Sequence, residues 1–593
     1  MRPADWAVLC ATLAAFVAYG VWRGRGSRDL SGFLLADRGF RWHTVWVSVM
    51  ATQASAITFL STPGQGFADG LRFVQFYFGL PLAMVALCVT VVPAFHRMKV
   101  FTAYEYLERR FDAKTRTLAS LLFLVQRGLA AGLTIYAPAL VLSVILGWDV
   151  RWTCALLGGL VVIYTTSGGS RAVGHAHFLQ FLVIMGTMGL AFVLIVRALP
   201  PGVGPLDAVA LAGRLGRLNA VNLAFDPNDR YNLWSGLIGG FFLQFSYFGT
   251  DQSQVGRYLT GQSVAQSRLA LLFNGLCKVP MQFGILFLGV MVFVFYQFAP
   301  PPLFFNPVEA RQVATGPHGD AWRALEERHA QAFAERRAHA EAFLAARRSG
   351  NDAARAVAGE ALTHAQAEAR ALREEAAELI HASDPRAQTS DNNYVFLSFV
   401  LHVLPIGVVG LVLAAIFAAS MNSTSSELNA LASTTVVDVY KRLRAVRAMN
   451  APSTAVPTHE TTAPTTARGS RDSARHEVTV SRIATVAWAA FAVAFAEYAS
   501  RLGTLVEAVN ILGSLFYGTI LGIFLAAFSL RRVGGTAVFV AALVAEVVVV
   551  ACFRYTKISF LWYNLVGCVA VMLLSLVLSA WWPRREGAGH AAG

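Results

Sequence analysis

Charged residues are scarce in this chain. Asp, Glu, Lys and Arg make up only 14% of its 593 residues, whereas hydrophobic residues make up 55%, and the mean hydropathy is +0.51. A water-soluble core cannot hide that much apolar surface. The composition therefore excludes a soluble globular protein and predicts a protein of the lipid bilayer.

Cysteine is also rare, and it is not arranged for metal or redox chemistry. The six cysteines fall inside or at the ends of apolar segments, and no CxxC spacing occurs. We interpret them as packing residues. No HExxH or comparable motif is present, so the sequence does not predict an enzyme. The cysteines are Cys10, Cys88, Cys154, Cys277, Cys552 and Cys568.

The basic excess is spread along the chain. The net charge is +14, but Lys and Arg lie in many short segments between the apolar ones, so we expect no nucleic-acid partner. Loops rich in Lys and Arg are typically cytoplasmic. Arg23, Arg25 and Arg28 follow the first apolar segment, whereas only Arg2 precedes it. We therefore expect an N-terminus outside, a cytoplasmic C-terminus and a location in the cell's inner, or plasma, membrane.

Apolar segments long enough to cross the hydrocarbon of a bilayer recur along the whole chain. About 20 such residues span the roughly 30 Å required, and we count about thirteen segments. The sequence therefore predicts an all-α polytopic membrane protein. The segments lie near 6–22, 44–67, 73–95, 117–147, 152–166, 175–198, 232–252, 268–298, 394–439, 481–500, 504–529, 534–553 and 558–582.

Two segments interrupt the apolar pattern. Residues 318–384 are rich in Ala, Glu and Arg around an SGND turn signal, which predicts a helical hairpin outside the membrane. Residues 443–478 are rich in Pro, Thr and Ala and predict a disordered inner linker. The hairpin histidines could bind a metal, but a solvated helix face is preferred; they are His329, His339, His364 and His381.

Polar residues interrupt the second apolar segment, which reads VWVSVMATQASAITFLSTPGQGFADG. Gln53, Ser55, Thr58 and the Pro63-Gly64 pair predict a broken helix. Unwound backbone within a bilayer is tolerated where it lines a cavity, and its free carbonyls can coordinate a cation. A packing face of small residues is the alternative.

The seventh and eighth segments carry further polar groups. Gln244 and Tyr247 share a helical face in FFLQFSYFGTDQSQVGRY, as expected for a small-solute site. Lys278 lies next to Pro280 in NGLCKVPMQFG. A lysine within the membrane is costly unless paired or hydrated, so it indicates function, with snorkelling from a helix end as the alternative.

Two histidines follow a Gly168-Gly169 turn in YTTSGGSRAVGHAHFLQ. His175 and His177 are two residues apart and do not share a helix face, so we do not expect a joint metal site. One histidine facing the protein interior is the preferred interpretation.

An unbroken polar run lies inside the ninth segment, in LAAIFAASMNSTSSELNALASTTVVDVY, residues 413–440. Hydroxyl and carbonyl oxygens suit an alkali cation. Ser423 lies four residues after Ala419, whose carbonyl is on the same side of the helix. These groups could form half of a sodium cage, and the broken second segment would supply the other half.

Together these motifs resemble the sodium:solute symporter family, which includes bacterial proline, sugar and sialic acid carriers and the animal sodium-glucose carriers. The resemblance covers almost the whole chain, and the order and spacing of the motifs make it specific. It rests on PGQGFADG, YTTSGGSRAV followed by FLQ, GTDQSQVGRYL, LCKVPM and GLVLAAIFAASMNSTSSELNALASTTVVDVY.

The resemblance implies a LeuT-type fold with two inverted five-helix repeats around a central substrate site. The implied division is 1–43 (first peripheral helix and inner loop), 44–200 (first repeat), 201–230 (outer loop), 231–530 (second repeat, with an extracytoplasmic insertion at 299–390 and a cytoplasmic linker at 441–480) and 531–593 (two peripheral helices and tail).

The family's principal sodium site maps onto the backbone of Ala51, Ala54 and Ala419 and the side chains of Asn422 and Ser423. Family members commonly have two hydroxyl residues at the last two positions, so Asn422 departs from the pattern. Its amide oxygen can still coordinate sodium. The implied coupling ion is Na⁺.

The substrate site of the family's sugar carriers maps onto Gln53, Thr58, Tyr77, Gln244 and Lys278, and Tyr247 matches the inner gate. A glutamate of the sugar carriers is missing at Tyr77, and Thr58 replaces a glutamine. A sugar is therefore not supported, and Lys278 could equally serve a carboxylate. Glu507 and Asn510 could complete the site.

Some family members hold a second ion with an aspartate after the Gly-Gly turn, where this chain has Ala176-His177. A histidine does not replace a carboxylate as a sodium ligand, so we expect one coupled sodium. The alternative is a second ion or proton site formed by His177, Ser425 and Ser426, in which His177 titrates.

The sequence thus predicts sodium-coupled symport of a small organic solute by alternating access, with that solute and the lipid bilayer as partners. A proton-coupled carrier on the same fold is the closest alternative. A transporter-like membrane sensor is less favoured, because the sequence shows no kinase-like soluble domain. A passive channel would need no coupling-ion site.

Overall fold

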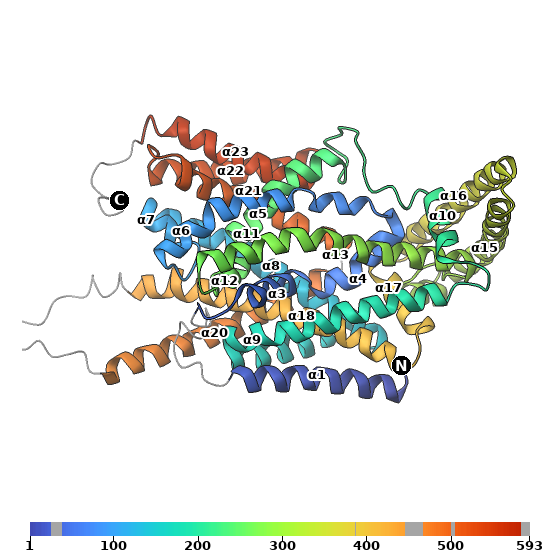
Figure 1. The fold of residues 1–593 in the computed structure, drawn as a ribbon, viewed down its shortest axis with the longest axis horizontal. Coiled ribbons are helices and arrows are strands. Elements are labelled where there is room, and N and C mark those ends of the chain that lie inside the picture. The colour runs from blue at the N-terminus through green and yellow to red at the C-terminus, as the bar shows by residue number, and fades with distance from the viewer. Residues whose placement is uncertain (25–37, 386, 445–466, 500–503, 583–593) are drawn as a thin grey trace, which may run out of the picture.

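The computed structural model describes residues 1–24, 38–385, 387–444, 467–499 and 504–582, which form an almost entirely helical bundle (Figure 1). Within these residues, β-structure is limited to an isolated bridge between Phe40 and Gly261. The thirteen predicted apolar segments all lie on helices. The all-α prediction is confirmed.

The first half of the chain forms α1 (Pro3–Gly24), α3 (Trp42–Gln53), α4 (Ala56–Asp69), the 3₁₀ helix η2 (Arg72–Tyr77), α5 (Leu80–Val89), α6 (Val91–Met98), α7 (Glu105–Arg110), α8 (Ala113–Leu146), α9 (Val150–Arg197) and α10 (Pro205–Arg214).

The second half forms the π-helix η3 (Ser235–Gly239), α11 (Gly240–Gly249), α12 (Gln252–Tyr258), α13 (Val264–Phe298), α14 (Pro307–Thr315), α15 (Gly319–Arg348), α16 (Asp352–Ser383), α17 (Asn392–Val403), α18 (Val408–Thr434), the π-helix η4 (Thr435–Tyr440), α20 (Ala467–Ala499), α21 (Leu505–Ser529), α22 (Gly535–Tyr555) and α23 (Phe560–Leu578).

Many of these helices are suited to a bilayer. Among the described residues, nine are long and apolar enough to cross it, and the bent pair α3–α4 would make a tenth. Shorter apolar helices lie at Pro3–Tyr19 and Val150–Ile163. Large apolar side chains such as Val89, Ile163 and Val547 are exposed on the outside of the bundle. This surface is typical of a multi-pass membrane protein.

The fifth and sixth predicted segments form one helical element, α9, although the sequence predicted a turn between them. Thr153, near its start, donates a hydrogen bond to the Ala139 carbonyl of α8 (2.9 Å). Its last residue leads to α10, whose Asp207 pairs with Arg347 and Arg348 at the end of α15. Val150, at its start, lines a pocket with Pro307 of α14, which leads into α15, so both ends of α9 lie near the same end of the bundle and the chain doubles back within this element.

The predicted hairpin is present as the antiparallel pair α15–α16, which projects beyond the bundle (Figure 1). Its turn contains Gly350 at a φ of 69°, a left-handed conformation that favours glycine. We call this side of the molecule the hairpin end. The start of α1 also lies there, whereas α23 runs to the opposite end (Figure 1), as an odd number of crossings requires.

Two sequence interpretations need correction. His329 is buried at the base of the hairpin, not on a solvated face, because α15 packs against the bundle there. The predicted linker extends too far, because α20 is already helical from Ala467; residues 445–466 lie outside the described part of the chain. The ninth segment is longer than one straight span, as its length indicated, and forms two helices, α17 and α18, divided near Gly407 at a φ of 84°.

Among the cysteines, Cys88, Cys154 and Cys568 are buried as packing residues, whereas Cys10 is exposed on α1.

Candidate functional site

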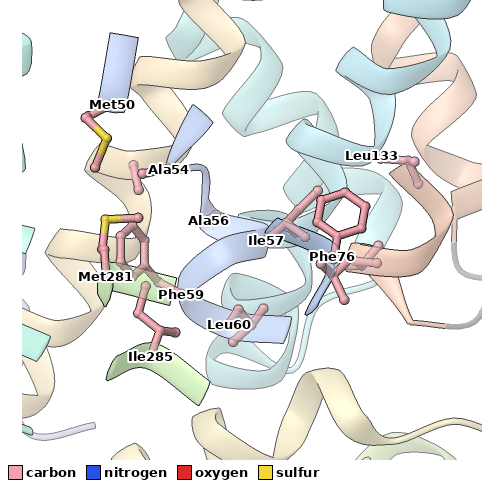
Figure 2. Packing of buried hydrophobic residues seen from close by; sticks show 14 of the residues in the cluster. Met50, Ala54, Ala56, Ile57, Phe59, Leu60, Phe76, Leu133, Met281 and Ile285 are labelled. Carbon is pink, nitrogen blue, oxygen red and sulfur yellow. The ribbon is translucent and has the colours of Figure 1, made fainter. Parts of the chain in front are cut away.

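The site begins at a break between α3 and α4. The two helices meet at an angle of 61° across Ala54 and Ser55 (Figure 2). Met281 and Ile285 of α13 lie beside this break (Figure 2). The sequence predicted a broken helix here. It also assigned Pro63 and Gly64 to the break, but both residues lie inside α4.

The polar run of α18 lies against this break. The Ser423 hydroxyl donates a hydrogen bond to the Thr52 carbonyl (2.9 Å), and the Thr52 and Ser426 hydroxyl oxygens are 3.2 Å apart. The structure thus brings together the second and ninth predicted segments. Ala51, Ala54 and Ala419 are all buried in the main hydrophobic core.

Asn422 has a buried side chain without a protein partner. It is 0% exposed, and its Oδ1 and Nδ2 atoms make no hydrogen bond to the described residues. A buried polar group without a partner normally indicates a water, an ion or a strained site. Its own carbonyl accepts hydrogen bonds from Ser425 (3.1 Å) and Ser426 (2.8 Å). A free amide oxygen on the residue that precedes Ser423 is chemically suited to a hard cation.

A central cavity of about 110 Å³ adjoins the Ser423 side of the break. All five residues that the sequence predicted for the substrate site line this cavity. They are Gln53, Thr58, Tyr77, Gln244 and Lys278, together with the predicted gate Tyr247 and with Asn510. Glu507 instead pairs with Arg230 (2.7 Å) and accepts a hydrogen bond from Tyr231 (3.0 Å).

Lys278 is the cation of this cavity that lacks a partner. It is 2% exposed, and no described carboxylate lies within 4 Å of its ammonium nitrogen. The nitrogen lies 5.5 Å from the centre of the Tyr77 ring, as in a cation–π contact. One turn earlier on α13, Asn274 accepts a hydrogen bond from Gln53. Lys278 is therefore available to an anionic group inside the cavity.

A buried ionic network closes the other side of the cavity, away from the hairpin end. Arg127 of α8 pairs with Asp251 and with Glu427 (3.0 Å). It also donates a hydrogen bond to the Tyr517 hydroxyl (2.7 Å), which donates to Asp251 (3.0 Å). The network therefore joins α8, α18 and α21 to the start of α12.

The predicted gate residue Tyr247 lies against this network. Its ring is 5.9 Å from that of Tyr517 and 5.5 Å from the Arg127 guanidinium carbon, and its hydroxyl accepts a hydrogen bond from Gln254 (2.7 Å). Sequence reasoning found Tyr247 but missed Arg127, Asp251 and Glu427. Charged residues inside apolar segments were the available signal, because they are costly there unless paired.

His177 is fully buried next to α3. Its Nδ1 lies 3.3 Å from the Ser48 hydroxyl, and its Nε2 has no described hydrogen-bond partner. Ser48 is one turn before Thr52, which meets Ser426. His177 and the hydroxyl run of α18 are thus connected along one face of α3.

The model of the sodium:solute symporter family matches residues 33–317 and 376–455, well over half of the chain. The chain therefore belongs to the sodium:solute symporter family, a family of transporters and not of enzymes.

Several curated relatives match about half of the chain. The human sodium/iodide cotransporter is 31% identical over 303 residues, 50% of this chain and 46% of the relative. The human sodium-coupled monocarboxylate transporter 1 is 32% identical over 274 residues, 46% of this chain and 44% of the relative. The rabbit sodium-dependent multivitamin transporter is 31% identical over 301 residues. The chain thus spans about half the length of these relatives.

A solved structure matches along almost the whole chain. It is described as the substrate-bound outward-open state of a Na⁺-coupled sialic acid symporter. The TM-score is 0.70 over 98% of each chain, at 21% identity. This match confirms the expected LeuT-type fold.

Proposed function

We propose that this protein is a sodium-coupled symporter that carries a small organic anion, in particular a carboxylate, by alternating access. The observation that carries this proposal is the unpaired Lys278 ammonium inside a cavity that shares Ser423 with the helix break. A buried cation without a counter-ion is stabilised by an anionic ligand. The named substrates of the relatives above include iodide and monocarboxylates, which are anions.

The same proposal assigns one sodium ion to the break. The carbonyls of Ala51, Ala54 and Ala419 would face the ion, together with Asn422 and Ser423. The unpartnered amide of Asn422 supports this assignment. One sodium ion crossing 100 mV contributes roughly 2.3 kcal/mol, but a monoanion carried with it opposes this by the same amount, so the sodium concentration gradient would drive accumulation of the solute.

We further propose that Gln53, Thr58, Tyr77 and Gln244 hold the body of the solute while Lys278 binds its carboxylate. Tyr247 would act as the inner gate. Residues 44–200 and 231–530 would be the two inverted repeats, with the hairpin end outside the cell and the C-terminus in the cytoplasm. The loops rich in Lys and Arg support this orientation.

The first test is thermal stability of the purified protein with a solute panel, in sodium buffer and in matched choline buffer. The panel contains lactate, pyruvate, biotin, sialic acid, iodide and glucose. A ligand that binds the native state raises stability by RT ln(1 + [L]/Kd), so no prior substrate is needed. We expect sodium to stabilise the protein and a carboxylate to add to this effect only in sodium.

Two variants separate the parts of this proposal. Ser423→Ala should abolish the effects of both sodium and the carboxylate. Lys278→Met should keep the sodium effect and lose the carboxylate effect. A glucose response that survives Lys278→Met would contradict the assigned substrate class, and a missing sodium response would contradict the ion.

A proton-coupled carrier is the second candidate, because the buried His177 Nε2 has no described partner. In that case stability and uptake would follow pH without sodium, and His177→Ala would abolish the pH response. Ser425 and Ser426 would then share the second ion or proton site with His177.

A further inference from the structure

A second cavity, which we call the hairpin cavity, lies where the α15–α16 hairpin meets the bundle. Its volume is about 350 Å³, within the range of roughly 300–1,000 Å³ that small-molecule sites occupy. Aromatic walls come from Phe67, Phe293, Tyr296 and Phe304. Such walls can cover the apolar body of a small ligand.

Arginines dominate the charge of the hairpin cavity. Four guanidinium groups line it, against three carboxylates, which leaves an excess of one positive charge. The groups are Arg217, Arg336, Arg370 and Arg373, against Asp69, Glu374 and Asp391. His329 also lines the cavity, and burial lowers its pKa to about 4, so it is neutral near pH 7.

Two of the four guanidinium groups, those of Arg217 and Arg336, have no ion pair among the described residues, and only Arg336 belongs to the hairpin. Arg370 pairs with Glu374 (2.9 Å), and Arg373 pairs with Asp391 (2.7 Å). Arg336 is 5% exposed and has no ion pair among the described residues.

The neutral contacts of Arg336 leave part of its guanidinium free. It donates hydrogen bonds to the Tyr296 carbonyl (2.9 Å) and to Gln366 (3.4 Å), and its Nε has no described partner. Burial and the neighbouring Arg373 lower the pKa of Arg336 to about 10, so Arg336 keeps its charge at neutral pH. A buried positive charge that lacks a counter-ion attracts an anion.

Part of the hairpin cavity comes from a segment that the family model does not match. The family model matches up to residue 317 and resumes at residue 376, so it does not include the segment that supplies Arg336, Arg370 and Arg373. The cavity lies at the end of α4 that carries Asp69, whereas Thr58 of the same helix lines the central cavity. Eleven helical residues separate these two positions by about 16 Å.

We propose that the hairpin cavity is a second ligand site, which binds a small monoanion with an apolar or aromatic body and a carboxylate. The carboxylate pairs with Arg336 and the aromatic walls cover the rest of the ligand. The ligand is held about 16 Å from the central cavity, at the hairpin end of α4.

Benzoate is a suitable probe, because it combines a carboxylate with an aromatic ring. Isothermal titration uses the full-length Lys278→Met variant in sodium-free choline buffer, so that the central cavity does not contribute. Benzamide has the same shape without the charge and is the matched ligand control. We expect one benzoate site and at least tenfold weaker binding of benzamide.

The variant Arg336→Gln, made in the same background, should weaken benzoate binding about tenfold or more. The matched control is Arg337→Gln, because Arg337 is on the exposed side of α15 and pairs with Glu341. Arg370→Gln, at a more exposed lining residue, provides a second variant if Arg336→Gln does not fold. Equal binding of benzoate and benzamide, or loss of all benzoate binding in Lys278→Met, would overturn the proposal.

Discussion

Asn422 and Lys278 are both buried without the partner that burial normally requires. Asn422 has two polar atoms without described hydrogen bonds, and Lys278 has no described carboxylate neighbour. An unsatisfied buried polar group costs about 1–3 kcal/mol. A transporter tolerates such costs when its cargo removes them during each cycle.

This account predicts opposite effects of one substitution on stability and on ion binding. Asn422→Leu replaces the unsatisfied amide by an apolar side chain of similar volume, so the sodium-free protein should keep or gain stability, by up to about 1 kcal/mol. The stabilisation by sodium should disappear. Thermal unfolding over a sodium series measures both effects.

Asn564→Leu is the matched control, because Asn564 is equally buried but donates hydrogen bonds to Ser514 (3.0 Å) and to the Leu561 carbonyl (3.1 Å). This variant should lose about 1–3 kcal/mol and keep the sodium response. A full sodium response in Asn422→Leu would remove Asn422 from the ion site.

The sequence was most informative about the cavity at the level of single residues. Gln53, Lys278 and Tyr247 stood out because polar groups are rare in apolar segments. The Arg127 network was missed because its members lie on separate helices, and only the folded chain brings them together.

At the scale of helices, α4 is packed closely against its neighbours by glycine. A Cβ added at Gly289 of α13 would lie 2.0 Å from the Pro63 carbonyl oxygen, and one at Gly66 would lie 2.3 Å from the Leu286 carbonyl oxygen. Backbones this close leave no space for a side chain. The position of α4, and with it the position of Thr58, therefore depends on these glycines.

Gly289→Ala should force α4 and α13 apart and cost about 1–3 kcal/mol in thermal or denaturant unfolding. Gly284→Ala on the same helix is the control, because a Cβ there meets nothing within 4 Å. That variant should be neutral or more stable by up to about 1 kcal/mol, since alanine favours helix more than glycine does. Equal stability of the two variants would contradict the packing argument.

The helices themselves were largely predictable, whereas their interruptions were not. Length and hydropathy located the apolar segments. The sequence placed part of the break at Pro63-Gly64, but a proline can be accommodated in a membrane helix when its neighbours satisfy the backbone. The chain instead bends at Ala54 and Ser55, where α18 supplies a hydroxyl group to the Thr52 carbonyl.

At the scale of the whole molecule, the Arg127 network holds four helices together on one side of the central cavity. In the proposed alternating-access cycle this side would open and the network would separate. The strength of the network would then set how often the empty protein opens there.

Asp251→Asn tests this idea with little local damage. Asparagine can still accept the hydrogen bond from the Ser253 amide that caps α12, but it removes one negative partner of Arg127. We expect a loss on the order of 3 kcal/mol from the network and faster hydrogen exchange of the amides of α12.

Glu507→Gln serves as the control for this measurement, because its partner Arg230 is largely exposed and such a pair contributes less than about 1 kcal/mol. It should leave exchange in α12 unchanged. Unchanged exchange in Asp251→Asn as well would show that the network does not hold this side closed.

The global arrangement could be predicted because bilayer topology and family motifs constrain it strongly. The role of the hairpin could not be predicted, because its sequence is typical of a solvated pair of helices. Its contacts with the bundle, such as the hydrogen bond from Arg336 to the Tyr296 carbonyl of α13, join residues that are distant in the sequence.

Part of the hairpin packs in a hydrophobic cluster with Leu303, Phe304 and Val313 of the preceding segment, whereas Ala340, Phe343, Leu344 and Leu362 of the hairpin belong to the main core. Trp322 and Leu325 of α15 pack with Leu372 and Ile380 of α16 in a cluster separate from the main core. Because its two helices are antiparallel, the chain leaves and rejoins the bundle at neighbouring points. The insertion can therefore be exchanged as one continuous segment. Transplanted between the matching helices of a relative, it would carry its arginines with it and test whether a new ligand response can be installed as a single unit.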